Sequence, residues 1–472
     1  MPSKSKTIAE QNITSASVSD DVNTSTGAFD MPAGTTAQRP SSPTDGNIRY
    51  NTDLDTTEIY AEGQWGKVSP LTPVLSSITG EIFTTIARNI TLNGSNFLTG
   101  NLIVSFTPSG GSASTVTVSP TNDQEATVAV PSAIYGESAG TVIGISVTNS
   151  DNRISSTVNK TVRALPSGGT ILVDGDERTH IFKASTTNFV VPTGITLSNV
   201  EYLVVAGGGG GGGSYRGGGG GAGGLLTSVT NDPVSSNGGS VQSKLTLTTG
   251  TYTMNVGAGG TGSQYYYGTA GGNSTIVNPS STALVTTIGG GRGGYYTGAN
   301  QGGAGGSGGG SAGFTQANGA GGAGTAGQGN AGGQGAGGSN TVPQCGGGGG
   351  GAGAAGVNGG SGGTAGDGGN GVISTIISTT EATANSVGEV VGSDVYFAGG
   401  GGAGSYDNGN NEPIGGLGGG ADGFYGDSPY GNGRNASHPN TGGGGGGSSG
   451  TTNTFGTGGT GADGVIIIRY TL

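Results

Sequence analysis

Residues 200–213 read VEYLVVAGGGGGGG, an apolar run that passes directly into glycine, and residues 464–470 read GVIIIRY, where glycine passes back into an apolar run. The first transition recurs where YTMNV (252–256), ALVTTI (283–288) and DVYFA (394–398) each precede a glycine segment. β-Branched and aromatic residues of this kind favour strands. We therefore expect repeated units in which a core strand leads into a glycine segment.

Glycine makes up 111 of the 472 residues, roughly three times its average share, and most of it follows residue 206. Several segments show a period of three. The clearest are the series Gly329, Gly332, Gly335, Gly338 and the series Gly360, Gly363, Gly366, Gly369. Three residues per turn is the period of the polyproline-II helix, whose backbone N–H and C=O groups point outward and need partners. Helices without side chains can approach closely enough to bond to one another, so the pattern predicts a lattice of polyglycine-II helices.

Two other interpretations of the glycine compete with this lattice. Collagen also has a period of three, but here the register breaks repeatedly and no proline occurs between Pro279 and Pro343, so collagen is excluded. Disorder is the stronger competitor, because glycine-rich chains usually behave as flexible linkers. The strand-like runs that bracket the glycine segments favour an ordered structure.

Composition and strand pattern divide the chain into residues 1–70, 71–166 and 167–472. The first part holds three strand candidates, GNIRYN, TTEIYA and QWGKVS, which predict a small β-meander that includes Trp65. This meander is too small to bury a core alone, so we expect it to pack against a neighbour or another copy of itself. The second part holds seven short strands, typical of an immunoglobulin-like sandwich that acts as a spacer. The predicted fold class is all-β with polyglycine-II helices framed by strands.

Three resemblances to known families add to this interpretation. The pattern GTTAQRPSSPTDGNIRYN (34–51), followed by a Glu-x-Tyr strand and a Trp, resembles a segment of tail-fibre and other virion proteins of tailed bacteriophages, including those of marine cyanobacteria. The strings ITLNGSNF (90–97), TVAVPS (127–132) and VTNSDNRIS (147–155) resemble the IPT/TIG family. The arrangement of glycine segments and flanking strands over 168–472 resembles the glycine-rich domain of phage tail-tip adhesins.

The last resemblance implies that polyglycine helices pack as a sandwich and that the loops between them select the host receptor. Taken together, the resemblances imply a non-enzymatic virion protein, made in the host cytoplasm, that binds other virion proteins through its N-terminal region. The small N-terminal β-segment and the analogy with fibres also lead us to expect a homotrimer. The receptor would be a host cell-surface glycan or an outer-membrane protein. A head fibre or capsid decoration protein without a receptor role remains an alternative, as does a polysaccharide depolymerase.

The charge balance excludes other classes of partner. With 16 Lys+Arg against 28 Asp+Glu, the net charge is −12 and the isoelectric point is about 4.5, so we expect no binding to nucleic acid or to an anionic membrane surface. No apolar run approaches the roughly 20 residues of a membrane helix, and the N-terminus lacks the apolar stretch of a signal peptide. Membrane insertion is not expected, and the single Cys345 forms no internal disulfide.

Motifs of catalysis and metal binding are weak. GxGxxG strings arise by chance at this glycine content, and His180 and His438, the only two histidines, lie in no metal-ligand spacing. The sequence DGDE (Asp174–Glu177) could bind Ca²⁺, but an Asp-Gly turn between strands explains it as well. We predict no catalytic residues, no metal and no cofactor, although a pair of carboxylates for glycan cleavage would leave no local motif.

The tyrosines are the informative side chains, since most of the 16 lie after residue 206, where they interrupt glycine segments. Tyrosine offers a flat apolar face and a hydroxyl at low entropic cost, which suits contact with a sugar or a protein loop. The candidate receptor-contact residues are Tyr215, Arg216, Tyr265, Tyr266, Tyr267, Arg292, Tyr295, Tyr296, Tyr406, Phe424, Tyr425, Tyr430, Arg434 and His438. On turns between adjacent helices they would emerge at one or both ends of the lattice; alternatively, they cap the lattice or pack between subunits. Tyr202, Tyr252 and Tyr470, within strands, are expected in the core.

Overall fold

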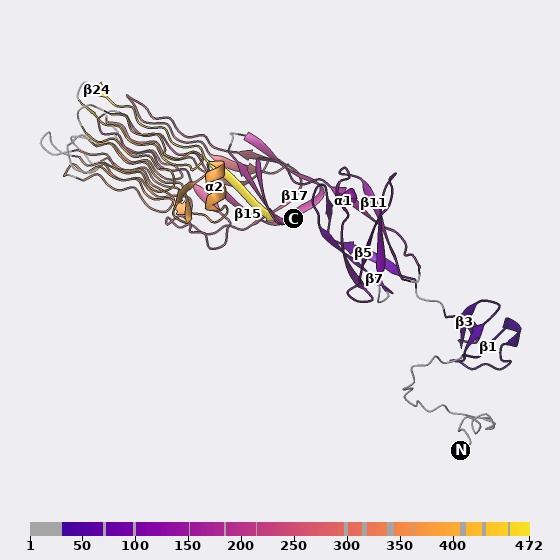
Figure 1. Cartoon of the computed structure of the whole chain (residues 1–472). Coiled ribbons are helices and arrows are strands. Elements are labelled where there is room, and N and C mark those ends of the chain that lie inside the picture. The colour runs from indigo at the N-terminus through magenta and orange to yellow at the C-terminus, as the bar shows by residue number, and fades with distance from the viewer. Residues whose placement is uncertain are drawn as a thin grey trace, which may run out of the picture.

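The fold is that of a computed structural model, and it is nearly all β (Figure 1). It describes residues 31–68, 72–97, 101–150, 152–183, 186–213, 215–296, 301–313, 319–337, 344–360, 362–405, 412–426, 431–451 and 454–472. Within these residues no helix has the length and apolar character needed to cross a bilayer. The predicted all-β fold class is confirmed.

The N-terminal unit is a four-stranded sheet in the order β1-β2-β3-β4. Its elements are β1 (Ala33–Gly34), the 3-10 helix η2 (Thr36–Gln38), β2 (Ile48–Asn51), β3 (Thr56–Ala61) and β4 (Gln64–Lys67). The last three strands match the predicted GNIRYN, TTEIYA and QWGKVS. The centre of the unit is polar, because Arg49, Asn51 and Glu58 are its buried charged and amide side chains.

The next unit is a sandwich of two sheets, as predicted, with one two-residue strand and one short helix beyond the seven predicted strands. One sheet has the order β10-β7-β5 and the other β6-β12-β11-β8-β9, the strand order of an immunoglobulin-like fold. The elements are β5 (Val74–Thr79), β6 (Ile82–Phe83), β7 (Asn89–Ser95), β8 (Leu102–Pro108), β9 (Ser114–Val118), β10 (Glu125–Ala129), α1 (Ser132–Tyr135), β11 (Val142–Thr148) and β12 (Val158–Arg163). Aliphatic side chains with Phe97 and Phe106 fill the space between the sheets.

An eight-stranded sheet forms the base of the glycine-rich region, in the order β13-β14-β25-β15-β17-β18-β19 with β16 beside β15. The strands are β13 (Thr170–Asp174), β14 (Glu177–Phe182), β15 (Thr186–Val205), β16 (Leu225–Thr227), β17 (Leu245–Asn255), β18 (Ser274–Val277), β19 (Ala283–Thr287) and β25 (Val465–Thr471). In β25, Ile466 and Ile468 pack into one hydrophobic cluster and Val465 and Ile467 into another. The sheet is therefore buried on both faces at its centre, as the apolar runs predict. Tyr202, Tyr252 and Tyr470 lie in the core, which confirms that expectation.

The sandwich packs directly against this base. Phe83 belongs to the same hydrophobic cluster as Phe182. The Arg88 guanidinium donates to the backbone carbonyl of Leu472 at 2.7 Å and pairs with Asp176 at 3.4 Å. These contacts fix the base, and hence the glycine-rich region, to the sandwich.

Smaller elements complete the glycine-rich region. They are β20 (Val372–Ile373), α2 (Thr379–Asn385), β21 (Glu389–Val391), β22 (Asp394–Phe397) and the hairpin β23 (Gly450–Thr451) with β24 (Thr454–Phe455). The helix α2 is not among the predicted elements. It begins with a capping box in which the Ser378 hydroxyl accepts the Glu381 N–H and the Glu381 carboxylate accepts the Ser378 N–H.

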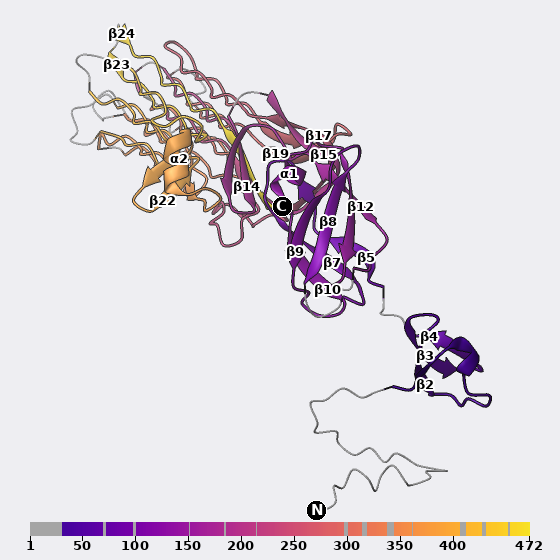
Figure 2. The same ribbon diagram turned by 45° about the vertical axis from the view of Figure 1, so that its right-hand side comes forward.

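The glycine segments form long extended runs that leave the base side by side (Figures 1 and 2). Run 206–213 shows the bonding rule, since every third N–H donates to the same neighbour. Gly207 and Gly210 donate to run 268–273, Gly208 and Gly211 to run 456–464, and Gly209 and Gly212 to run 217–224. Its carbonyls accept from runs 256–263, 288–294 and 442–449. Six neighbours around one helix is the hexagonal lattice expected of polyglycine II, and the lattice is ordered as predicted.

The lattice requires glycine because the backbones approach so closely. A Cβ added at any position from Gly207 to Gly213 would lie between 1.8 and 2.3 Å from a backbone oxygen of a neighbouring run. None of these glycines adopts a left-handed φ. Glycine is needed here for space, and not for an unusual backbone conformation.

Runs at the outside of the lattice lack a neighbouring run on one side, and there side-chain oxygens accept backbone N–H groups in place of backbone carbonyls. The Asn432 and Asn435 amide oxygens accept the N–H groups of Thr457 and Thr460, at 2.8 and 2.9 Å. The same relation joins Asp367 to Ile414 and Asn370 to Leu417. Each pair repeats at a spacing of three, so polar side chains satisfy the perimeter with the period of the helix itself.

Candidate functional site

The strongest candidate site is the end of the lattice that lies away from the base sheet, where Figure 1 places β24. Each loop there joins an outgoing run to a returning run, so residues far apart in sequence meet. Run 206–213 continues into Tyr215 and Arg216, run 256–263 into Tyr265–Tyr267, and run 288–294 into Tyr295 and Tyr296. We call the tyrosines of these loops, together with Arg216, Arg292 and Phe455, the tip cluster.

One half of the tip cluster is centred on Tyr215. Its ring meets the ring of Tyr296 edge-on at 4.6 Å between centroids and that of Phe455 at 5.1 Å. The Tyr265 ring also meets the ring of Phe455 edge-on, at 5.6 Å between centroids. Edge-to-face contacts at these distances stabilise aromatic clusters beyond simple burial, so four loops are held together by their rings.

The other half is centred on Tyr295, whose ring lies 6.0 Å from the ring of Tyr266 and 6.0 Å from that of Tyr267. Tyr266 is the most open of these side chains, with 71% of its surface exposed, and Tyr265 is 50% exposed. Burial raises the pKa of the Tyr295 phenol, with a smaller contribution from Tyr266. The phenol of Tyr295 therefore stays neutral at physiological pH.

Both arginines of the tip cluster lie over aromatic rings. The Arg292 guanidinium is 4.5 Å from the centroid of the Tyr267 ring. The Arg216 guanidinium is 5.6 Å from the Tyr296 ring and 5.9 Å from the Tyr215 ring, and it also donates to the Gln344 side chain. Cation–π contacts order these long side chains, so the tip offers a fixed set of flat rings and positive charges to a ligand.

The structure thus brings eight of the predicted contact residues together, and two more lie close by. Tyr425 forms a backbone bridge with Ser405 near the ends of their runs, and the Gly426 carbonyl accepts the Ser449 hydroxyl at 2.6 Å. Because Ser449 also bridges Arg216, Phe424 and Tyr425 are at the same end of the lattice as the tip cluster. Tyr406 and Tyr430 lie outside the described residues.

Two predicted residues lie elsewhere. Arg434 is on the side of the lattice, where it pairs with Asp422 at 2.7 Å and with Glu412. His438 is near the base, because the neighbouring Asn440 donates to the Ser386 carbonyl at the end of α2. The structure separates both from the tip cluster, since Arg434 sits along a run instead of in a turn and His438 follows a run that returns to the base.

Phe455 is the member of the tip cluster that the sequence analysis does not include. It lies in SSGTTNTFGTGG (448–459), where an aromatic residue interrupts a glycine segment in the same way as the tyrosines do. The criterion that selects the tyrosines and Phe424 also fits Phe455, so the sequence carries the signal for this residue as well.

The groups considered above for catalysis or metal binding lie in the core or in a turn between strands. The His180 ring is fully buried; its Nδ1 is 2.7 Å from the Gly168 carbonyl and its Nε2 is 2.9 Å from the Tyr470 hydroxyl. Asp174 and Glu177 lie opposite each other in the antiparallel register of β13 and β14, on either side of the tight turn that joins these strands. Among the described residues, no three His, Cys, Asp or Glu side chains gather in a way that could hold a metal ion.

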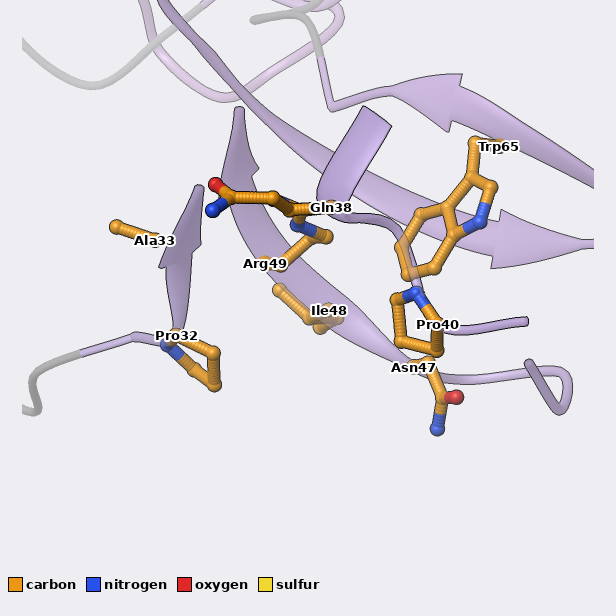
Figure 3. A pocket seen from close by; sticks show the side chains of 8 residues that line it. All are labelled: Pro32, Ala33, Gln38, Pro40, Asn47, Ile48, Arg49 and Trp65. Carbon is orange, nitrogen blue, oxygen red and sulfur yellow. The ribbon is translucent and has the colours of Figure 1, made fainter. Parts of the chain in front are cut away.

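A cavity of about 300 Å³ lies in the N-terminal sheet (Figure 3). Its lining residues are Pro32, Ala33, Gln38, Pro40, Asn47, Ile48, Arg49 and Trp65. The cavity combines apolar walls with one arginine. It lies in a different unit from the tip cluster.

Comparison with known protein families identifies the same region as a glycine-rich domain. The sequence model of the glycine-rich domain family matches residues 183–471, which include most of the base sheet and all of the glycine runs. No curated protein and no solved structure matches the chain.

Proposed function

Since this chain belongs to the glycine-rich domain family, we propose that its glycine lattice is a scaffold for binding, in a structural protein of a tailed-bacteriophage virion. The protein would be a tail fibre or tail-tip adhesin whose tip cluster contacts a host-surface receptor, either a glycan or an outer-membrane protein. The observation that carries the proposal is the meeting of four loops in one cluster of tyrosines and arginines at the end of a rigid lattice.

The chemistry of the tip cluster supports a binding role. Loops on a rigid scaffold are favoured binding sites, because the scaffold fixes their geometry before the ligand arrives. Tyrosine and arginine are enriched among the residues that dominate binding energy at interfaces. An exposed ring such as Tyr266 can stack on a sugar or pack against a protein loop, while Arg216 and Arg292 can donate hydrogen bonds.

The other units take supporting roles in this proposal. The N-terminal unit, with its phage virion motif, would attach to other virion proteins, and the sandwich, resembling the IPT/TIG family, would act as a spacer. The chain would be non-enzymatic, work as a homotrimer and reside in the virion after synthesis in the host cytoplasm.

A binding assay on whole cells tests the proposal. Labelled full-length protein is incubated with a panel of bacterial strains, cyanobacteria included, and bound protein is measured after washing. The combined variant Tyr265→Ala and Tyr266→Ala should lose binding at least tenfold, because it removes the two most exposed rings without touching the lattice. The matched control His438→Ala, which lies near the base, should bind as the wild type does.

The remaining classes predict different outcomes. A head fibre or decoration protein would bind no strain, with the tip tyrosines serving as lattice caps. A depolymerase would release soluble sugar from the surface polysaccharide of a strain that it binds, and neutralising single carboxylates would abolish that release.

A further inference from the structure

Acidic residues are unevenly distributed along the chain. Although the sequence has 28 Asp+Glu against 16 Lys+Arg, residues 202–366 contain one acidic residue, the buried Asp232. This stretch supplies every member of the tip cluster except Phe455. Asp407 and Asp427 belong to other loops and lie outside the described residues. The tip cluster therefore gathers positive charge in a chain that is acidic as a whole.

Arg292 is the exposed cation of this cluster. Its guanidinium lies 4.5 Å from the centroid of the Tyr267 ring, and among the described residues it makes no ion pair and no side-chain hydrogen bond. Arg434 is also exposed, but it pairs with Asp422 and Glu412 on the side of the lattice. A contact with a ring orders a guanidinium without using its N–H donors. Arg292 can therefore donate two parallel hydrogen bonds to an anion from outside.

Exposed aromatic surface lies in the same part of the tip cluster. The rings of Tyr266 and Tyr267 both lie 6.0 Å from the ring of Tyr295, and Arg292 lies over Tyr267. The side chain of Tyr266 is 71% exposed. A flat, exposed ring offers an apolar face on which a sugar ring can stack. The cation and the ring together fit a sugar that carries a negative charge.

Resting on the receptor-binding role proposed above, we propose that the tip cluster binds an acidic polysaccharide of the host surface, whose sugars carry carboxylates. Arg292 binds the carboxylate and Tyr266 stacks on the sugar ring. One guanidinium carries one charge and matches the two oxygens of one carboxylate, whereas a phosphate monoester carries about −1.5 to −2. Protein partners are held mainly by anchors in desolvated pockets, and the openness of Tyr266 favours a glycan instead.

The net charge of −12 does not oppose this binding. Run 206–213 spans roughly 20 Å from the base sheet to the tip, because a helix of this type rises about 3.1 Å per residue. Exposed charges interact over about 8 Å at physiological ionic strength. The acidic residues of the base therefore contribute little to the potential at Arg292.

The test uses full-length protein and a strain that it binds in the whole-cell assay. The surface polysaccharide of that strain is purified, freed of protein with proteinase K and used as a competitor for cell binding. In one portion, carbodiimide activation and borohydride reduction convert each carboxylate to a primary alcohol and leave phosphate groups unchanged. The intact polysaccharide should compete, and the carboxyl-reduced polysaccharide should compete about tenfold more weakly or worse, as for the loss of a hydrogen bond to a charged group.

Two variants assign the carboxylate to its partner. Arg292→Gln removes the cation but keeps a polar side chain, so it should bind the intact polysaccharide about tenfold more weakly or worse. It should also no longer distinguish the intact from the carboxyl-reduced polysaccharide. Arg434→Gln is the matched control, because it removes an exposed arginine from the side of the lattice, and it should behave as the wild type does. Calorimetric melting checks that both variants fold, and the comparison of the two polysaccharides on the wild type needs no variant.

Three outcomes would overturn the inference. Loss of binding when intact cells are treated with proteinase K would make the receptor a protein. Equal competition by the intact and the carboxyl-reduced polysaccharide would mean that a neutral or phosphate-bearing sugar is bound. An Arg292→Gln variant that distinguishes the two polysaccharides as the wild type does would assign the carboxylate to another group. Each of these leaves the receptor-binding role standing, whereas a protein that binds no strain would overturn that role as well.

Discussion

Gly209 lies so close to the carbonyl oxygen of Gly291 that a Cβ at position 209 would come within 2.1 Å of it. Gly209 also donates its N–H to Gly221 at 2.8 Å. The neighbouring runs are in turn bonded to others, so the Gly291 backbone cannot move aside without breaking further bonds. The absence of a side chain is therefore what allows the lattice to form.

The first prediction is that Gly209→Ala destabilises the glycine-rich region by on the order of 1–3 kcal/mol or more, the usual cost of overpacking. Calorimetric melting of the full chain measures it as a lower transition temperature. Gly362→Ala is the matched control, because a Cβ at position 362 meets no atom within 4 Å. A melting temperature that falls equally in both variants would contradict the close-packing argument.

The second prediction concerns the perimeter. Asn435→Ala removes the oxygen that accepts the Thr460 N–H at 2.9 Å, so that N–H should exchange with solvent faster. The Thr457 N–H, which Asn432 accepts, should keep its protection. Hydrogen exchange followed by NMR distinguishes the two amides. Because water can replace the lost acceptor at an exposed site, global stability should change by only about 1 kcal/mol or less.

The sequence is sufficient to predict the lattice for a physical reason. With three residues per turn, every third backbone N–H faces the same neighbouring run. Gly332 and Gly335 show this, because their N–H groups donate to the carbonyls of Gly322 and Gly319, which belong to one run. The helix α2 could also have been predicted, since Ser378 and Glu381 form the S-x-x-E signature of a capping box.

The assembly of the tip cluster is only partly predictable. That tyrosines lie on turns follows from their interruption of glycine segments. That Tyr215, Tyr296 and Phe455 meet depends on which runs become neighbours, and glycine segments carry no side chains that specify a partner. The separation of Arg434 and His438 from the tip has the same origin, because the direction and length of each run fix their positions.

The third prediction is a pH dependence from His180. Burial lowers the pKa of this imidazole below its usual value of 6.5, with a further lowering from Arg178 opposed by the Gly168 carbonyl. As the pH falls through 6.5, the unfolded chain takes up a proton that the folded chain does not. The stabilising contribution of His180 is therefore present above pH 6.5 and is lost below it, by up to about 1.4 kcal/mol per pH unit.

Two measurements check the histidine prediction. The chain has only two histidines, so NMR can follow each imidazole, and the signal of His180 should titrate with a midpoint below 6.5. Urea denaturation at a series of pH values should show the loss of stability in the wild type and in His438→Ala. If His180→Gln showed the same slope between pH 6.5 and 5, the loss would have another source.

The fourth prediction concerns the buried Asp232. Its carboxylate accepts the Ser374 hydroxyl at 2.5 Å and both the N–H and the hydroxyl of Thr375, at 3.0 and 2.8 Å. Asp232→Asn replaces an acceptor oxygen with an N–H₂ donor, which then faces another donor. We expect a loss of roughly 1.5–3 kcal/mol, as for hydrogen bonds to a charged group. Asp394→Asn, at the start of β22, is the control in the same melting experiment.

The last prediction tests whether the tip cluster acts as one unit. The Phe455 ring contacts the rings of both Tyr215 and Tyr265, at 5.1 and 5.6 Å between centroids. Phe455→Ala removes both contacts but leaves the lattice runs intact, so the melting temperature should hardly change. Binding to host cells should nevertheless fall several-fold, because Tyr265 and Tyr215 lose the ring that positions them. Phe455→Tyr keeps the ring and should retain binding. If Phe455→Ala bound cells as strongly as the wild type, the receptor would contact the tyrosines one by one, and the ordering of the cluster by its rings would play no part in recognition.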